Sequence, residues 1–370
     1  MIIGVPKEIK NHEYRVGMTP TGVRELIHQG HQVLVQREGG TAIGLTNELY
    51  EAAGATLVES PQEIFASADM IVKVKEPQPQ ECAMFRPGQL LFTYLHLAPD
   101  PEQTKLLVAS GAIAIAYETV TDDHGGLPLL APMSEVAGRM AIQAGAHSLE
   151  KAQGGNGTLL GGVPGVEPGK VVVIGGGVVG ENAARMAMGL GADVTVLDRS
   201  IDRLKLLDNL YGPRLKTRFS TVESVESMVC EADLVVGAVL IPGAAAPKLV
   251  KRDTLAKMKK GAVLVDVAID QGGCFETSKA TTHQDPSYSI EGVVHYCVAN
   301  MPGGVARTAT FALTNSTLPY VIALANKGYR RALLDDKHLR NGLNVFKGQV
   351  TCQPVASDLG YEYVSATDVL

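Results

Sequence analysis

The chain has 370 residues, of which 45% are hydrophobic and 19% are charged, and its formal net charge is −6. This length suggests two domains, and the composition is that of an ordinary globular protein. The negative charge excludes a broad basic surface for nucleic acid or anionic lipid. The five cysteines form no C-x-x-C pair, so neither a zinc site nor a disulfide framework is expected. With no signal peptide and no membrane-length apolar run, we expect a cytoplasmic protein.

Strand-like and helix-like segments alternate from the first residue, a pattern typical of parallel sheets with crossover helices. The first helix is predicted to begin with Thr19 as N-cap and Pro20 as its first residue, and to end at Gly30. Strands are expected at residues 2–5 and 32–36, and further strands, short and apolar on both faces, at 70–75, 90–95 and 112–117.

A long helix is predicted over residues 132–154, followed by a loop rich in glycine and proline over 154–169. Further strands are expected at 171–174, 192–198, 234–238, 263–267 and 293–296, and helices at 307–327 and 329–341. The predicted fold is α/β, with two Rossmann-like domains of parallel sheets flanked by helices. The last helices have room to return to the first domain.

Two segments of the first half resemble two segments of the second. Residues 68–75 resemble residues 232–239, and residues 88–97 resemble 261–270. We infer two sheets of related design, although apolar strands also resemble one another by chance. If the resemblance is real, Lys75, His96 and Asp270 lie at or just past the carboxyl ends of strands, where open parallel sheets bind ligands. We expect a cleft between the two domains to gather these three residues.

A glycine turn carries the strongest local motif. Gly175, Gly177 and Gly180 follow an apolar strand and open a helix, and Asp198 ends the next strand. This spacing is typical of dinucleotide binding, with the pyrophosphate at the helix N-terminus. The alternative is a glycine turn that only packs the strand against the helix. Asp198 favours NAD over NADP because it would repel a 2′-phosphate.

Four side chains are candidates for the chemistry, each with a structural alternative. Arg15 lies in a polar loop and offers a planar fork to a carboxylate, or is a surface arginine. Of Lys73 and Lys75, one is expected to face water and the other to point into the cleft, and the alternative for Lys75 is a solvated surface lysine. His96 is the best general acid/base, or a satisfied core histidine. Asp270 is a catalytic carboxylate, or caps a turn.

With these residues in view, the chain resembles the alanine dehydrogenase family from end to end. The second signature of that family is similar to residues 154–198. The first, shared with the NAD-binding subunit of proton-translocating transhydrogenase, is similar to residues 4–8, Asn11, Glu13, Arg15, Val16, Thr19 and Pro20.

The resemblance implies reversible, NAD-dependent oxidative deamination of L-alanine to pyruvate and ammonia. Arg15 and Lys75 would bind the substrate carboxylate and carbonyl, His96 would act as acid/base, and Asp270 would handle the attacking water or ammonia. NAD would contact Ser134, Gly175, Gly177, Val178, Val179, Gly180, Asp198, Arg203, Ser220, Val239, Leu240, Val267, Ala268, Ile269, Asp270, Lys279, Val298, Ala299, Asn300 and Met301.

The same resemblance implies a substrate domain of residues 1–128 plus 307–370, an NAD-binding domain of residues 129–306, and a homohexamer. The main alternative is the soluble NAD(H)-binding subunit of a transhydrogenase, a partner-docking module. An NAD-binding structural or sensory protein, such as a recruited lens-type dehydrogenase, and a lysine-pathway dehydrogenase are more distant alternatives. The joint presence of Lys75, His96 and Asp270 favours the deaminating enzyme.

Overall fold

The computed structural model describes residues 1–239 and 246–370, and these residues form two compact units. Unit 1 comprises Met1–Met133 and Ala306–Leu370, and unit 2 comprises Ser134–Val305. The chain therefore leaves unit 1 once and later returns to it. Within the described ranges, no helix is long and apolar enough to cross a membrane.

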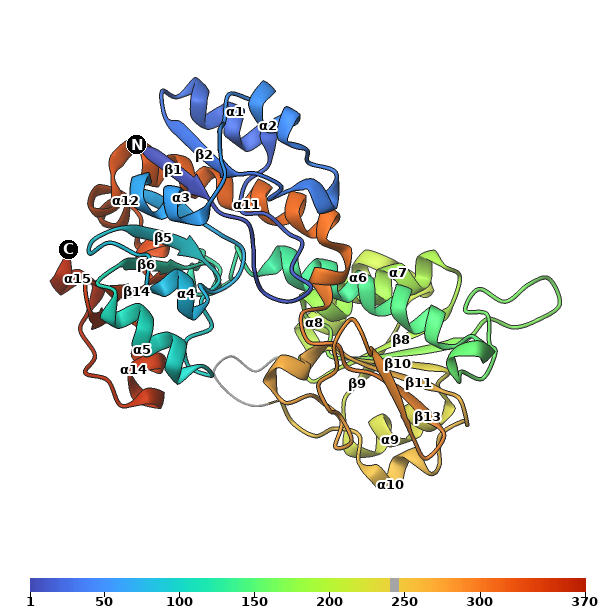
Figure 1. Ribbon diagram of the computed structural model, residues 1–370. Helices are drawn as coiled ribbons and strands as arrows, with labels where there is room; N and C mark the ends of the chain where they lie inside the picture. The colour runs from blue at the N-terminus through green and yellow to red at the C-terminus, as the bar shows by residue number, and fades with distance from the viewer. Residues whose placement is uncertain (240–245) are drawn as a thin grey trace. The chain divides into compact units, whose positions relative to one another are not determined.

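Unit 1 is built on a sheet of eight strands in the order β15-β14-β6-β5-β4-β1-β2-β3 (Figure 1). The six strands from β6 to β3 are parallel, whereas β14 pairs antiparallel with both β6 and β15. In chain order the strands are β1 (Ile2–Val5), β2 (Gln32–Gln36), β3 (Thr56–Val58), β4 (Met70–Val72), β5 (Leu90–Thr93), β6 (Ile113–Ala116), β14 (Leu343–Phe346) and β15 (Gln349–Val350).

Helices cover the sheet of unit 1. Apolar side chains of α3, α5 and α14 form one core cluster with Ile71, Leu91 and Ala114 of the sheet. The long helix α11, from the returning part of the chain, packs beside α1 (Figure 1). These helices are α1 (Pro20–His28), α2 (Asn47–Ala52), α3 (Pro61–Ser67), α4 (Pro79–Cys82), α5 (Pro101–Ala109), α11 (Ala306–Lys327), α12 (Tyr329–Asp335), α13 (Lys337–Arg340), α14 (Gln353–Leu359) and α15 (Ala366–Val369).

Unit 2 is built on a sheet of seven strands in the order β12-β13-β11-β10-β7-β8-β9. Six strands are parallel, and β12 is an antiparallel edge strand paired with β13. The strands are β7 (Lys170–Ile174), β8 (Asp193–Asp198), β9 (Lys216–Phe219), β10 (Leu234–Gly237), β11 (Val263–Asp266), β12 (Ser287–Ile290) and β13 (Val293–Tyr296).

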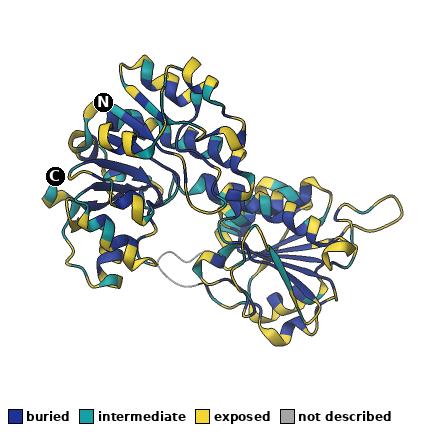
Figure 2. Cartoon of the chain, in the orientation of Figure 1, coloured by how far each residue is buried: buried dark blue, intermediate teal, exposed yellow. Residues whose placement is uncertain are grey.

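Side chains alternate across the sheet of unit 2 and supply a core on each face. Val171 and Val173 pack with α6, α7 and α8 on one face, whereas Val172 and Ile174 pack with α9 and α10 on the other. Figure 2 shows the strands buried and the outer surfaces of the helices exposed. The helices are α6 (Ala131–Ser148), whose first residues belong to unit 1, α7 (Val178–Gly189), α8 (Ile201–Tyr211), α9 (Val222–Glu231) and α10 (Arg252–Leu255).

The two sheets have the same design, as the internal resemblance predicted. Counted within each unit, the six parallel strands follow the order 3-2-1-4-5-6, the order of dinucleotide-binding domains. Segments 68–75 and 232–239 contain the fourth strand of each unit, and segments 88–97 and 261–270 contain the fifth. The predicted α/β fold with two helix-flanked sheets is confirmed.

Several local predictions were wrong in detail. The strands predicted over 70–75 and 90–95 end at Val72 and Thr93, and the helix predicted to reach 154 ends at Ser148. The start of α1 is as predicted, because the side chain of Thr19 accepts the amide of Gly22. The sequence patterns missed the short strands β3, β9, β12, β14 and β15. The sheets are therefore mixed at their edges rather than wholly parallel.

Candidate active site

The glycine turn of unit 2 has the geometry that a pyrophosphate needs. Gly175 has φ of +99°, and a Cβ there would lie 2.7 Å from the carbonyl oxygen of Ala238. A Cβ on Gly180 would overlap the carbonyl oxygen of Gly175, so this glycine permits close packing of helix on strand. A Cβ on Gly177 would meet no atom of the described residues within 4 Å, so these residues leave space beside the start of α7. These are the three roles that a dinucleotide-binding turn requires of its glycines.

Asp198 and Arg203 are both tied to this turn. The carboxylate of Asp198 accepts the amides of Gly176, at 2.6 Å, and of Ser200, at 2.8 Å. The Nε of Arg203 donates to the carbonyl oxygen of Gly176 at 2.5 Å, and its Nη2 pairs with Glu181. Arg203 is therefore already engaged by protein groups, which lessens its use as a partner for a 2′-phosphate.

The other predicted cofactor residues of unit 2 gather at one edge of its sheet. Parallel strands end at the same edge, and ligands bind outside those ends. Val178 and Val179 begin α7, Ser134 lies in α6, and Lys279 donates its amide to the hydroxyl of Tyr288. The strand ends are followed by Ser220 after β9, Val239 after β10, Val267, Ala268, Ile269 and Asp270 after β11, and Val298, Ala299, Asn300 and Met301 after β13. Leu240 lies outside the described residues.

Asp266 organises the loop after β11, and sequence reasoning assigned it no role. Its fully buried carboxylate accepts the amides of Ala268, Cys274 and Phe275 and the hydroxyl of Ser278. Burial raises the pKa of this carboxyl, although these hydrogen bonds act in the opposite direction. One carboxylate thus links the cofactor segment 267–270 to the chain that follows it.

Asp270 is exposed in the single-turn helix Val267–Gln271. The start of this helix is capped by Asp266 rather than by Asp270, because the side chain of Asp266 accepts the amide of Ala268. Asp270 itself stands four residues past the end of β11. Its carboxylate is thus placed at the carboxyl edge of the sheet, on the surface of unit 2.

In unit 1, Arg15 is buried rather than a surface arginine, with 2% of its side chain exposed. Glu13 holds it bidentately, by Nε at 2.7 Å and Nη2 at 2.5 Å. Burial opposes the charge, but the hydrogen bonds and charge of Glu13 raise the pKa of Arg15 above its usual value. The Nη1 lies 3.3 Å from the sulfur of Met133. The guanidinium is therefore charged and rigid, and it lies in the loop of residues 6–19 that follows β1.

The two lysines after β4 differ from the prediction. Lys73, which was free to face water in one reading, is fully buried between Glu8 and Glu81, with its Nζ at 3.0 and 2.7 Å from their carboxylates. Lys75 has 14% of its side chain exposed, and its Nζ lies 3.7 Å from Glu76. Lys73 is thus structural, and Lys75 is the lysine with access to solvent at this edge.

His96 is exposed, with 44% of its side chain accessible, so the reading as a buried core histidine was wrong. Its φ is +47°, and its backbone amide donates to Glu118 at 2.6 Å. The imidazole is stacked on Tyr94, with the planes 7° apart. Glu118 also accepts the amide of Leu95, so this glutamate fixes the left-handed turn that presents His96. Glu118 follows β6, which places it at the same edge of the sheet.

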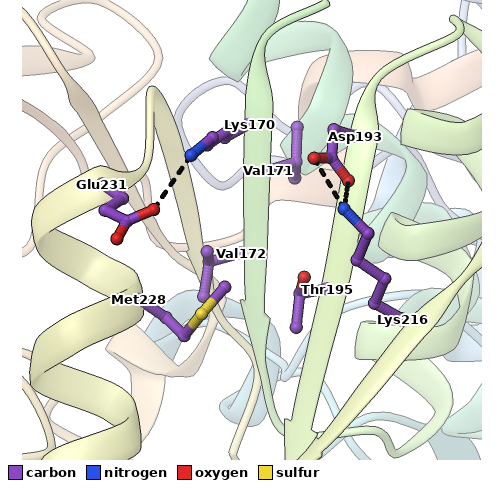
Figure 3. A pocket seen from close by; sticks show the side chains of 8 residues that line it. All are labelled: Lys170, Val171, Val172, Asp193, Thr195, Lys216, Met228 and Glu231. Carbon is purple, nitrogen blue, oxygen red and sulfur yellow. Dashed lines mark hydrogen bonds and ion pairs between the residues drawn. The ribbon is translucent and has the colours of Figure 1, made fainter.

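A pocket of about 140 Å³ lies at the opposite edge of the unit 2 sheet (Figure 3). Its charged lining residues are already paired: Lys170 with Glu231 at 2.9 Å, and Lys216 with Asp193 at 2.6 Å. Lys170, Asp193 and Lys216 are the first residues of β7, β8 and β9. This pocket is therefore remote from the strand ends that carry the glycine turn. Among the described residues no group of His, Cys, Asp and Glu is arranged to hold a metal ion.

Comparisons with known proteins agree with this geometry. The family model described as "Alanine dehydrogenase/PNT, N-terminal domain" matches residues 4–137, and its C-terminal counterpart matches residues 141–353. An alanine dehydrogenase of Halomonas elongata is 63% identical over 370 residues, covering both chains completely. An alanine dehydrogenase of Bacillus subtilis is 57% identical over 371 residues, covering all of this chain and 98% of its own.

Solved structures give the same answer. An L-alanine dehydrogenase superposes with a TM-score of 0.95 at 51% identity, covering 97% of this chain and 99% of that one. A transhydrogenase from Sinorhizobium meliloti shares the fold, with a TM-score of 0.81, but is only 24% identical over 95% of this chain and 99% of its own. The chain therefore belongs to the alanine dehydrogenase/PNT family, and it lies with the alanine dehydrogenases rather than with the distant transhydrogenases.

Proposed function

We propose that the chain catalyses the reversible reaction of L-alanine, NAD⁺ and water to pyruvate, ammonium, NADH and a proton. The proposal is carried by the set of side chains found at one edge of the unit 1 sheet. There a guanidinium, an ammonium and an imidazole follow the ends of β1, β4 and β5, in a chain 63% identical to an alanine dehydrogenase. Such a set can bind a carboxylate and exchange protons with the same small molecule.

Arg15 and Lys75 bind the substrate in this proposal. Arg15 is held rigid by Glu13, so little side-chain entropy is lost when it meets a carboxylate. The Nζ of Lys75 lies 3.7 Å from the carboxylate of Glu76. Its ammonium group binds the carboxylate and carbonyl oxygens of the substrate in this proposal. Together they fix the direction of the Cα–H bond, which is chiefly an orientation effect.

His96 and Asp270 carry out the proton transfers and the hydrolysis. The exposed imidazole of His96 accepts a proton from the ammonium group of alanine and releases it to solvent; it later accepts a proton from the attacking water and donates it to the departing amino group. The exposed carboxylate of Asp270 orients that water, or ammonia in the reverse direction. NAD, when bound, supplies the hydride acceptor.

NAD is proposed as the cofactor in preference to NADP. The three glycines fit a pyrophosphate, and Asp198 stands where a ribose 2′-hydroxyl would donate to it. The contacts proposed for NAD are the segments at the strand ends of unit 2, with Ser134, Arg203 and Lys279. Leu240 is proposed with them by resemblance alone.

The domain, assembly and compartment assignments are proposals of the same kind. Residues 1–128 and 307–370 would form the substrate domain, and 129–306 the NAD domain. Resemblance to the family supports a hexamer, which light scattering coupled to gel filtration would test through a mass of six chains. All five cysteines are unpaired, which supports work in the cytoplasm and is testable by cell fractionation.

The test of the activity is the appearance of NADH absorbance with L-alanine and NAD, repeated with serine, glycine and NADP. We expect turnover with alanine and NAD, and much less with NADP. Absence of signal with alanine would refute the proposal. If hydride then passed from NADH to an NAD analogue without any amino acid, the transhydrogenase-subunit reading would replace it.

A further inference from the structure

Glu8 bridges the two strands at the centre of the unit 1 sheet. It follows β1, and the segment that it contacts, residues 73–75, follows β4, the neighbour of β1. From β1 the strand order runs to β2 and β3 on one side, and to β4, β5 and β6 on the other. Ligands of open parallel sheets bind at the point where the strand order reverses. Only 2% of the Glu8 side chain is exposed, so its carboxylate acts on protein groups alone.

The two oxygens of Glu8 have separate tasks. Oε2 accepts Lys73 Nζ at 3.0 Å. Oε1 accepts the backbone amides of Val74 at 2.7 Å and of Lys75 at 3.3 Å. One carboxylate therefore fixes the backbone on the amino side of Lys75.

A second hydrogen bond fixes the carboxyl side of the same residue. The hydroxyl of Thr93, the last residue of β5, donates to the carbonyl oxygen of Lys75 at 2.9 Å. Tyr117 similarly donates to the carbonyl oxygen of Lys73 at 3.0 Å. Lys75 lies past the end of its strand, and its peptide groups are bonded on both sides; the carbonyl oxygen of Val74 also accepts the amide of Tyr94 at 3.3 Å.

Charge balance alone does not explain Glu8. Lys73 already has a carboxylate partner in Glu81 at 2.7 Å, and this pair would be neutral. A second buried carboxylate carries a desolvation cost, and burial raises the pKa of Glu8 despite the charge of Lys73. Glu8, unlike Glu81, accepts the backbone amides of Val74 and Lys75.

We propose that Glu8 is a positioning residue: with Thr93, it fixes the backbone of Lys75 so that the lysine's ammonium group meets the substrate carboxylate. The inference rests on the proposed function, in which Lys75 binds that carboxylate. It assigns to Glu8 an effect on substrate binding, separate from any effect on folding.

Glu8→Met and Glu81→Met form a matched test. Each removes one of the two carboxylates from Lys73 and leaves a neutral pair, but only Glu8→Met leaves the amides of Val74 and Lys75 without an acceptor. For Glu8→Met we expect the KM for L-alanine and for pyruvate to rise about tenfold or more, with the Kd for NADH within about twofold of wild type. For Glu81→Met we expect a lower melting temperature and a substrate KM within about twofold of wild type. Equal effects of the two variants on substrate KM would overturn the inference.

If Glu8→Met does not fold, two variants of Thr93 test the inference instead. Thr93→Val keeps the shape but removes the donor to the Lys75 carbonyl, whereas Thr93→Ser keeps the donor. We expect the KM for alanine to rise roughly three- to tenfold in the first and to stay near wild type in the second. An unchanged KM in Thr93→Val would overturn the inference.

Lys75→Ala distinguishes a failure of the proposed role of Lys75 from a failure of the positioning role of Glu8. If this variant leaves the KM for alanine unchanged, the proposed role of Lys75 fails and the positioning role fails with it. If Lys75→Ala raises that KM while Glu8→Met and Thr93→Val do not, only the positioning role is overturned. Binding of NADH, followed by its fluorescence, is measured in all variants as a check on the fold.

Discussion

Units 1 and 2 follow their first strand with very different lengths of chain. In unit 2 only residues 175–177 separate β7 from α7, whereas in unit 1 residues 6–19 separate β1 from α1. The short connection brings backbone amides and a helix N-terminus to the edge of the sheet, where they suit a pyrophosphate. The long connection carries Glu8, Glu13 and Arg15 to the corresponding edge. The same strand order thus carries backbone amides at the edge of one sheet and ionised side chains at the edge of the other, and under the proposed function each would bind an anion.

The two connections after the first strand depend on different residue types. Unit 2 needs glycines, because side chains at Gly175 and Gly180 would collide with the backbone. Unit 1 needs counter-charges, because a buried cation such as Arg15 or Lys73 is costly without a carboxylate beside it. We therefore expect chemistry to be lost by side-chain changes in unit 1, and cofactor binding by backbone changes in unit 2.

The largest effect is expected at His96. His96→Asn removes the imidazole but suits the φ of +47°, because asparagine tolerates left-handed backbone. We expect kcat to fall about 10²- to 10⁴-fold while the Kd for NADH stays unchanged. The control is His12→Asn, at an equally left-handed histidine with φ of 55° and no assigned role. Near-normal kcat in His96→Asn would remove this residue from the mechanism.

Gly177→Ala should produce the reverse pattern. Its φ of −66° suits alanine and, in the part of the chain that the structure describes, no atom lies within 4 Å of the new Cβ, so the melting temperature should not fall. The methyl group would occupy space that the pyrophosphate needs, and we expect the Kd for NADH to rise about tenfold or more. Gly189→Ala, in the same helix and equally unobstructed, should leave NADH binding unchanged. If both variants bind NADH like wild type, the glycine turn does not contact the cofactor.

Asp198→Asn tests cofactor choice in unit 2. The change removes a negative charge from the end of β8 but keeps an acceptor for the amide of Gly176. We expect the ratio of kcat/KM for NAD to that for NADP to fall about tenfold. Asp202→Asn, a nearby exposed aspartate, serves as the charge-matched control. An unchanged ratio in Asp198→Asn would place the basis of selectivity elsewhere.

The smallest effect is expected at Glu181. Partial burial opposes its ionisation, but hydrogen bonds from Tyr211 and Arg203 outweigh this and lower its pKa from 4.5. An acid with a lowered folded pKa stabilises the fold above its unfolded pKa, and this contribution is lost as the pH falls through the folded value. Glu181→Gln should therefore cost under about 1 kcal/mol at pH 7, and the difference from wild type should shrink as the pH falls below the usual pKa of a glutamate. Urea unfolding across this range measures it, and a difference that grows toward acid pH would contradict the assignment.

Sequence patterns predicted the fold better than they predicted the site. The similarity of segments 68–75 and 232–239 predicted the repeated sheet, because strand position depends on short apolar runs. Strands β14 and β15 were missed, and β15, with two residues, is too short to carry a pattern of its own. The pairing of β14 with β6 joins residues more than two hundred positions apart.

Within the site, the patterns found the cations and missed the carboxylates that hold them. Lys73 and Lys75 are two residues apart in the same motif, and nothing local distinguishes the buried one from the accessible one. The distinction depends on Glu8, which is 65 residues from Lys73 in the chain. Asp266 was missed for a related reason, since the donors that it serves lie in a later loop.

The discontinuity of unit 1 has a consequence for how the chain is made. When residue 133 leaves the ribosome, β6 still lacks its neighbour β14, and the helix α11 does not yet exist. At typical rates of synthesis the remaining residues take on the order of ten to fifty seconds, during which unit 2 can complete itself. Until then β6 is an open edge on the nascent chain, the kind of surface on which strands of other chains add. Premature termination after residue 305 would leave that edge open permanently, so completion of the unit 1 sheet depends on the last 65 residues.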